Sequence, residues 1–283
     1  MEKSTMNEKI KELQERVKSI SFEELTEFSK AWKQGYFAGL HKYSFFNFCI
    51  ANFQLKRQGK FATALASFKT WSDKGFRVKA GEKAVSVFAP ILQKYEVEVE
   101  KNGKKEIEEK KILKGYRLVP VFDISQTDGD ISKLTVETGG LTGKWTDGQS
   151  IINFEQLVEK FKIPVRIYPV SENGENGHTD GKSISILKKE NEEMITTLLH
   201  EIAHFNLHFG SDRKELTPEA KECEAETVSY LVSIALGIDN KKSALYIKGW
   251  NENFKNVSVK KIMNCTEKML KTIFSTDTDT EIA

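Results

Sequence analysis

The segment 191–208 constrains the fold most strongly, because it is predicted to form a largely buried helix that contains a histidine pair. Apolar residues precede and follow the sequence His200-Glu-Ile-Ala-His204. Residues four apart lie on one face of an α-helix, about 6 Å from each other. Two histidines and a glutamate without partners would be costly inside a buried helix. The fold must therefore provide a partner for this group.

A metal ion is the partner that this spacing favours. Two imidazoles at this spacing can bind one Zn²⁺ ion through bonds of about 2.0–2.1 Å. Glu201 follows the first histidine and is expected beside the open coordination position, where it would take a proton from metal-bound water. The pattern predicts a Zn²⁺ site with His200 and His204 as ligands and Glu201 as the catalytic residue. The alternative is that both histidines are satisfied core residues.

The third ligand is expected from a following helix, predicted over about 218–236. As in zincins of the glutamate type, Glu222 would bind the metal, and Glu226, one turn later, would support a ligating histidine. Glu224 points to a different helix face and is the alternative ligand. His208 is about 12 Å along the helix from His200, so we expect it to pack or to line the rim of the site.

The distribution of charge divides the chain, although its 283 residues contain 43 Lys and Arg against 41 Asp and Glu. Residues 1–120 have 24 basic and 15 acidic residues, a net charge of +9, and the remainder has 19 and 26, a net charge of −7. This division suggests a polyanion partner for the first part and different chemistry in the second. A solvated basic face is the alternative.

Several classes of protein are disfavoured by the same sequence. No apolar run reaches the roughly 18 residues of a membrane-spanning helix, and the polar start lacks the apolar stretch of a signal peptide. Cys49, Cys223 and Cys265 are too few and too scattered for a disulfide framework or a cysteine zinc site. We expect a cytoplasmic protein with no membrane partner.

Periodicity and turn signals predict an α+β fold with two domains. Residues 1–125 are expected to form an N-terminal helix-plus-antiparallel-sheet domain, with helices over 5–34 and 44–55 and a hairpin turn at Asn102-Gly103. Residues 126–150 are polar, glycine-bearing and aperiodic, and are predicted as a linker. Residues 151–283 would form the second domain, with strands at 164–170 and 183–187 and long helices over about 191–208, 218–236 and 258–274.

Basic and aromatic residues alternate between Tyr43 and Lys83. Proteins bind single-stranded nucleic acid by stacking its bases on aromatic rings while lysine and arginine follow the phosphates. This composition therefore suggests a single-strand-binding surface. For the aromatic residues, packing in the core is the alternative.

Together these motifs resemble the ArdC-type antirestriction proteins. Tyr43-Ser-x-x-Asn47, Trp71 before Gly75-x-x-Val-Lys-x-Gly-Glu-Lys83, and Val121-Phe-Asp-Ile-Ser-Gln-Thr127 resemble their N-terminal single-stranded-DNA-binding domain. His200-Glu-Ile-Ala-His204-x-x-x-His208 and Glu222-x-x-Ala-Glu226 resemble their C-terminal zincin-like metallopeptidase domain, which is related to the ImmA/IrrE peptidases. The matches run from about Tyr43 to about Gly249. Ala80 and Ala84 depart from the pattern of the first domain.

The resemblance implies a protein of mobile elements that binds single-stranded DNA and protects incoming DNA from restriction. It implies that His200, His204 and Glu222 hold Zn²⁺, that Glu201 is catalytic, and that the substrate is a protein of unknown identity. The residues in the matching stretch of the DNA-binding domain are Tyr43, Asn47, Trp71, Arg77, Lys79 and Lys83. For Tyr43 and Asn47, a scaffold role is the alternative.

Two other functions are compatible with the same sequence. One is a protein that coats single-stranded DNA and has a structural or vestigial zinc site. The other is an ImmA-like regulator protease that cleaves a repressor, in which the basic part would recognise protein.

Overall fold

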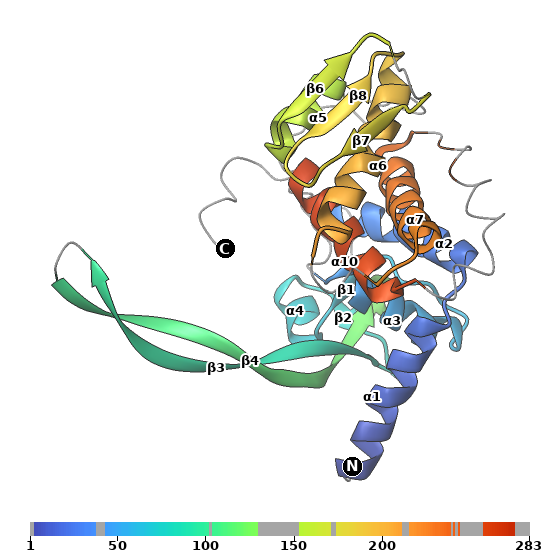
Figure 1. The fold of residues 1–283 in the computed structure, drawn as a ribbon. Coiled ribbons are helices and arrows are strands. Elements are labelled where there is room, and N and C mark those ends of the chain that lie inside the picture. Colours follow the sequence, from blue (N-terminus) through green and yellow to red (C-terminus); the bar gives the residue numbers. More distant parts are fainter. Residues whose placement is uncertain are drawn as a thin grey trace.

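Helices and mostly antiparallel strands make up the computed structural model of the chain, which is the α+β class expected from the sequence (Figure 1). The structure describes residues 3–37, 43–101, 104–129, 153–170, 174–210, 215–238, 240, 243 and 257–274. None of the helices formed by these residues combines the length and the apolar character that a membrane span requires.

The first helices are α1 (Lys3–Lys18), α2 (Phe22–Phe37) and α3 (Phe45–Lys56), close to the predicted bounds. Ser44 begins α3 as its N-cap, and its hydroxyl accepts a hydrogen bond of 3.2 Å from the Asn47 N–H. This bond satisfies one of the amides that have no partner within the first helical turn. Phe45, Phe48 and other apolar residues of α3 are buried, which is the alternative given above for the aromatic residues.

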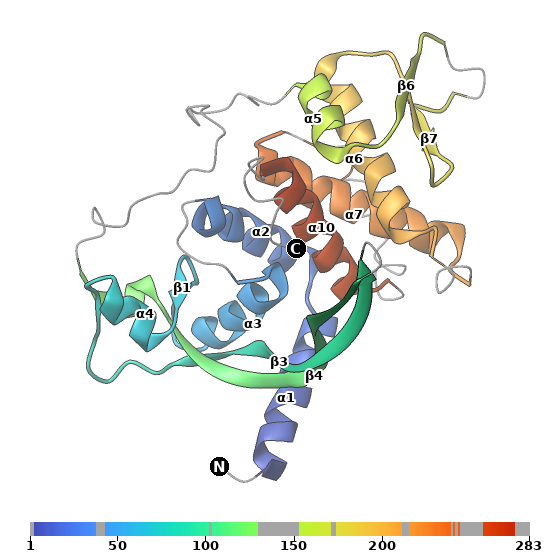
Figure 2. The ribbon, with the colours of Figure 1, turned by 90° about the vertical axis from the view of Figure 1, so that its left-hand side faces the viewer.

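A long two-stranded ribbon dominates the next region. It is formed by β3 (Val85–Lys101) and β4 (Lys104–Asp123), which pair antiparallel from Val85↔Val121 to Lys101↔Lys104. The predicted turn at Asn102-Gly103 lies outside the described residues. Figure 1 shows the far end of the ribbon extending away from the rest of the molecule. Its base lies against α3, which Figure 2 shows above the curved strands.

Short elements surround the base of the ribbon. They are β1 (Leu65–Ala66), α4 (Phe68–Asp73), β2 (Arg77–Val78), the 3₁₀ helix η1 (Ile124–Gln126) and β5 (Thr127–Asp128). β1 pairs with β4, and β5 pairs antiparallel with β2. Residues 126–128 of the segment predicted as a linker are therefore part of this folded region. Residues 130–150 of that segment lie outside the described residues.

The C-terminal region combines a small sheet with helices. Its elements are α5 (Phe154–Phe161), β6 (Val165–Tyr168), β7 (Gly177–Thr179), β8 (Ile184–Leu187), α6 (Asn191–Leu207), α7 (Pro218–Leu236) and α10 (Val259–Phe274). The strand order is β6-β8-β7, with β6 parallel and β7 antiparallel to β8. The predictions for α6, α7 and α10 are confirmed. β7 was not expected, because it lies in a stretch that reads as a loop.

Local signals explain the bounds of α7. The Thr217 hydroxyl accepts a hydrogen bond from the Ala220 N–H, and Pro218 occupies the first helical turn, where its missing N–H is not needed. Gly237 follows the helix with a φ of 77°, a left-handed conformation that side chains disfavour. These signals explain why α7 begins after Thr217 and ends before Gly237.

One apolar core contains residues from both parts of the chain. Buried members include Phe28, Trp32 and Phe48 in the first part and Leu198, Leu231 and Leu270 in the second. Polar contacts cross the same boundary, because the Ser29 hydroxyl donates to the Leu231 carbonyl at 3.3 Å and the Phe45 N–H donates to Glu267 at 2.8 Å. The two parts therefore stabilise each other. A second, smaller cluster contains Ala64, Ala66, Trp71 and Phe76.

Candidate metal centre

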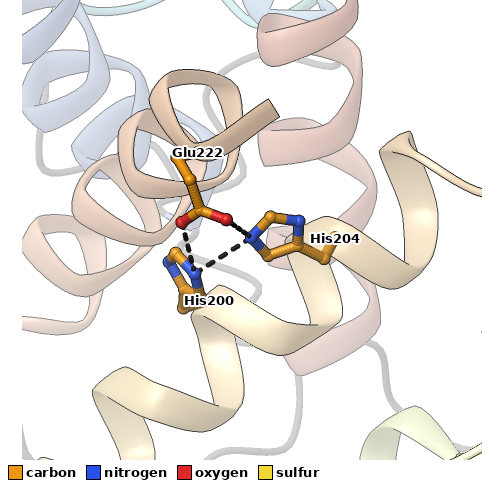
Figure 3. Close-up of side chains that lie close together, drawn as sticks. All are labelled: His200, His204 and Glu222. Carbon is orange, nitrogen blue, oxygen red and sulfur yellow. Dashed lines mark hydrogen bonds and ion pairs between the residues drawn. The ribbon is translucent and has the colours of Figure 1, made fainter. Parts of the chain in front are cut away.

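His200 and His204 extend from the same face of α6 toward the start of α7 (Figure 3). Their Nε2 atoms are 3.0 Å apart. Both side chains are largely buried, with exposed fractions of 18% and 15%. The helical spacing predicted from the sequence thus brings two imidazole nitrogens to one point.

Glu222 of α7 completes the cluster from the opposite side (Figure 3). Its two carboxylate oxygens lie 3.4 Å from His200 Nε2 and 3.2 Å from His204 Nε2. A tetrahedral ion with bonds of about 2.0–2.2 Å separates its ligand atoms by about 3.3–3.6 Å. The observed separations are close to this range. Two imidazoles and one carboxylate also form the donor set of known catalytic zinc sites, so these residues fit a divalent metal ion.

In the metal-free protein the carboxylate of Glu222 is readily ionised, while the His200 imidazole holds a proton more strongly than usual. Burial raises the pKa of Glu222, but hydrogen bonds and charge interactions with the two histidines lower it more, so it lies well below its usual value of 4.5. Burial lowers the pKa of His200, but the carboxylates of Glu222, Glu226 and Glu201 raise it above 6.5. Glu222 is therefore ionised over the whole range in which His200 titrates.

Glu201 is buried beside the cluster, with an exposed fraction of 6%. Burial raises its pKa above the usual 4.5, although His200 and His204 oppose this shift. A cleft of about 380 Å³ opens next to it and is lined by His200, Glu201, Glu226 and the edge strand residue Gly177. A base of raised pKa thus lies at the floor of a cleft that reaches a candidate metal ligand.

Glu226 lies one turn beyond Glu222 and approaches His200 from the other side. Its Oε1 is 3.6 Å from His200 Nδ1, an ion-pair contact that is longer than a hydrogen bond. Among the described residues, His200 Nδ1 and Glu226 Oε2 have no hydrogen-bond partner, although both atoms are buried. A small shift of either side chain would join them, as expected for a carboxylate that orients a metal-binding imidazole.

Glu224 and His208 lie behind the cluster and contact each other. Glu224 is fully buried, and it accepts hydrogen bonds from the Ser258 N–H at 2.8 Å and from His208 Nε2 at 3.2 Å. The other ring nitrogen of His208, Nδ1, is 2.9 Å from His204 Nδ1. Glu224, the alternative ligand in the sequence analysis, therefore faces away from the His200–His204–Glu222 cluster. His208 packs there as expected, but it also contacts a candidate ligand.

Of the candidate DNA-binding residues, Asn47 and Trp71 have the contacts of framework residues. The Asn47 side chain donates to the Phe88 carbonyl at 2.8 Å and accepts from the Phe88 N–H at 2.9 Å, which fixes α3 to β3. Trp71 is 1% exposed, and its indole N–H donates to the Phe122 carbonyl at 3.0 Å. The Trp71 side chain is thus buried, whereas Asn47 stays partly exposed.

Other residues of the resembling motifs also hold the fold together. The buried Asp123 carboxylate accepts backbone N–H bonds from Thr63, Ala64 and Ser125 at 2.7, 2.9 and 3.0 Å. Glu82 forms an ion pair with Lys60 and accepts from the Gln126 side chain at 3.0 Å. The hydrogen bonds from Lys60 and Gln126 lower the pKa of Glu82. Asp123 and Glu82 therefore stabilise the fold of this region.

The remaining candidates fall in two separate places. Arg77, Lys79 and Lys83 are exposed around β2, where Lys79 Nζ donates to the Ser125 carbonyl at 3.2 Å. Tyr43 is half-buried and lines a groove between α10 and the base of the ribbon. Burial raises the pKa of Tyr43, so its hydroxyl stays protonated. The structure therefore does not bring the six predicted residues into one site.

Sequence reasoning named His208 and Glu224 but missed the contact between them, because their pairing depends on how α7 crosses α6. It also missed Phe68. Phe68 is 60% exposed directly after the cap residue Ser67. An exposed ring among lysines was the expected pattern, but the sequence did not distinguish Phe68 from the buried Trp71 three residues later.

Fold and cluster together define an α+β protein with a two-histidine, one-glutamate site suited to a divalent metal. Residues 5–122 match the family described as the N-terminal domain of anti-restriction factor ArdC. This match covers the first part of the chain, where the sequence motifs indicated a resemblance to the ArdC N-terminal domain.

Relatives with longer matches were also found. The chain is 27% identical over 255 residues to an uncharacterised protein of Bacillus anthracis, in a match that covers 76% of this chain and 43% of that protein. The chain therefore spans less than half the length of this relative.

Two crystal structures of the antirestriction protein ArdC from the R388 plasmid are similar as well. The metal-free structure has 18% identity and a TM-score of 0.48, over 82% of this chain and 84% of that chain. The Mn(II)-bound structure has 16% identity and a TM-score of 0.47, over 90% and 96%.

Proposed function

We propose that this chain is an antirestriction protein that combines a zinc-dependent peptidase with a single-stranded-DNA-binding region. In this proposal residues 151–283 form a zincin-like metallopeptidase domain, residues 1–125 form the DNA-binding domain, and residues 126–150 connect them. The main support for peptidase activity is that His200, His204 and Glu222 converge beside the buried base Glu201.

The residues of the cluster suit peptide hydrolysis. A bound zinc ion would polarise the peptide carbonyl and lower the pKa of a water molecule. The Glu201 carboxylate would take a proton at one of its oxygens and return it to the leaving amine of the peptide. Its raised pKa brings it closer to neutrality, where a group can serve as both base and acid. Glu226 would hold the His200 ring in its ligating orientation.

The edge strand β7 provides a place for an extended substrate. It ends the order β6-β8-β7, so in the described part of the chain its outer edge is unpaired. At Gly177 a Cβ would lie only 2.7 Å from Thr197 Cγ2 and 3.2 Å from Glu201 Cγ, so glycine lets the strand approach α6 closely. A peptide that pairs with an exposed sheet edge gains main-chain hydrogen bonds. A peptide bound along β7 would pass beside Glu201.

The peptidase is tested by comparing two matched glutamate variants on a labelled unfolded protein such as casein, with Zn²⁺ present. Glu201→Gln should bind zinc and lose hydrolysis by a factor of about 10²–10⁴, the usual contribution of general acid–base catalysis. Glu192→Gln alters an exposed residue at the start of the same helix and should retain full activity. Equal activity of Glu201→Gln and the unmodified protein would contradict the proposal.

The DNA-binding region is supported by the ArdC match over residues 5–122 and by the basic excess of residues 1–120. The predicted contacts with an exposed or partly exposed side chain are Tyr43, Asn47, Arg77, Lys79 and Lys83. Such binding should weaken steeply with salt, because phosphate contacts release counterions.

The antirestriction role is tested by the recovery of an unmodified plasmid transferred as a single strand into a restricting host. Recovery should rise when the protein is present and stay unchanged if the proposal is wrong.

A further inference from the structure

A groove of about 800 Å³ runs between α10 and the base of the β3–β4 ribbon. Figure 2 shows α10 facing the curved ribbon. One wall comes from the first part of the chain, through α3 and the ribbon, and the other comes from the C-terminal helix. It is separate from the cleft beside Glu201, with which it shares no lining residue.

The first wall of the groove is aromatic. It contains Tyr43, Phe46, Phe88 and Tyr116. Phe88 contacts Phe46 and Tyr116, with ring centroids 5.9 and 6.3 Å apart. The contact with Phe88 supports one side of the Tyr116 ring, while 54% of this residue stays exposed. An aromatic ring that is supported on one side and exposed on the other provides a surface on which a flat apolar group can stack.

The second wall is basic. Lys260, Lys268 and Lys271 line it from the exposed side of α10 and extend over about 16 Å of helix axis. Glu267 is the acidic residue in this wall, and its oxygens already accept from Lys271 at 2.6 Å and from the Phe45 N–H at 2.8 Å. Lys268 donates to Asn206 at 2.6 Å. The lysines therefore leave a net positive charge facing the aromatic wall.

We propose that this groove binds single-stranded DNA, with a base stacked on Tyr116 and the backbone phosphates along Lys260, Lys268 and Lys271. Aromatic stacking together with a row of cations is the combination that single strands require and that duplexes, whose bases are already stacked, do not use. The inference rests on the proposed DNA-binding function and extends it, since α10 lies outside the region that matches the ArdC N-terminal domain. Both parts of the chain would then be needed for full affinity.

Anisotropy titrations of a fluorescein-labelled oligothymidylate with the whole chain test this site. Lys260→Ala/Lys268→Ala should weaken binding and reduce the slope of log affinity against log salt by about 1.4, because each phosphate contact on a single strand contributes about 0.7. Lys30→Ala/Lys182→Ala changes the net charge equally at exposed positions elsewhere and should leave the slope unchanged.

A second pair of variants tests the stacking. Tyr116→Leu should weaken binding about five- to a hundredfold, the range of base–aromatic stacking, whereas Tyr116→Phe should bind as the unmodified protein does. Three results would show that the groove is not the DNA-binding site. They are equal binding by the two lysine double variants, binding by Tyr116→Leu equal to that of the unmodified protein, and equal affinity for duplex and single-stranded DNA. If the unmodified chain binds no single strand, the proposed DNA-binding function itself fails.

Discussion

The imidazole rings of His204 and His208 contact each other through their Nδ1 atoms, which are 2.9 Å apart. Only one of these two nitrogens can donate in such a contact. His204 Nε2 faces Glu222 and His200, so a metal ion at the cluster needs the lone pair of that nitrogen. The hydrogen of His204 must then be on Nδ1. His208 accepts it and donates its own Nε2–H to Glu224, 3.2 Å away.

This arrangement predicts the tautomer of each histidine in the metal-bound protein. Long-range ¹H–¹⁵N NMR spectra should show His204 protonated at Nδ1 and His208 protonated at Nε2. His208→Ala should lower metal affinity about 10- to 100-fold, the usual effect of removing a group that orients a ligand. Observation of His208 with its hydrogen on Nδ1 would contradict this prediction, even if the variant also lost affinity by unfolding.

Metal affinity should depend on pH through His200. Burial lowers the pKa of this group, but Glu222, Glu226 and Glu201 raise it above 6.5 in the metal-free protein. A metal ion requires the neutral imidazole, so protons compete with it below that pKa, and affinity falls about tenfold per pH unit for each proton displaced. Affinity should therefore rise with pH and level off once His200 is neutral. It can be measured by competition with a chelator.

Glu226→Gln provides the control for this pH dependence. The variant removes one carboxylate that raises the pKa of His200, so the point at which the affinity levels off should move to lower pH. A midpoint that stays in place, or moves upward, would show that Glu226 does not act on His200 in the folded protein.

Asp123 is predicted to be a stability residue. Its buried carboxylate accepts three backbone N–H bonds, and Asp123→Ala would leave these donors without a partner inside the protein. The loss should lower the free energy of unfolding by about 2–4 kcal/mol. Denaturant unfolding measures it, with Asp73→Ala at an exposed position as the control. Equal stability of the two variants would contradict the framework role of Asp123.

The parts of the fold set by local signals could be predicted from the sequence. Periodicity gave α6, α7 and α10 within about two residues, and the four-residue spacing of His200 and His204 follows from helix geometry alone. The place of Glu222 in the cluster agrees with its predicted spacing from Glu226. β7 was missed, since a three-residue strand in a stretch of Asn and Gly has no periodicity to detect.

The remaining features of the fold and of the candidate sites depend on tertiary packing, which the sequence pattern does not reveal. Trp71 and Asn47 occur in a pattern that suits a nucleic-acid surface and a core equally well, and only the position of β4 and β3 above them makes them framework residues. The groove beside Tyr116 could not be predicted, because it forms where the last helix meets a ribbon more than 140 residues earlier in the chain.

The metal content of matched variants shows whether His200, His204 and Glu222 hold a metal ion. The protein purified with zinc should contain about one equivalent of the metal, as expected for a single catalytic site. Glu222→Gln should lose most of it, while Glu219→Gln, an exposed residue of the first turn of the same helix, should keep it. A protein without metal, or a Glu222→Gln variant that retains it in full, would contradict the account.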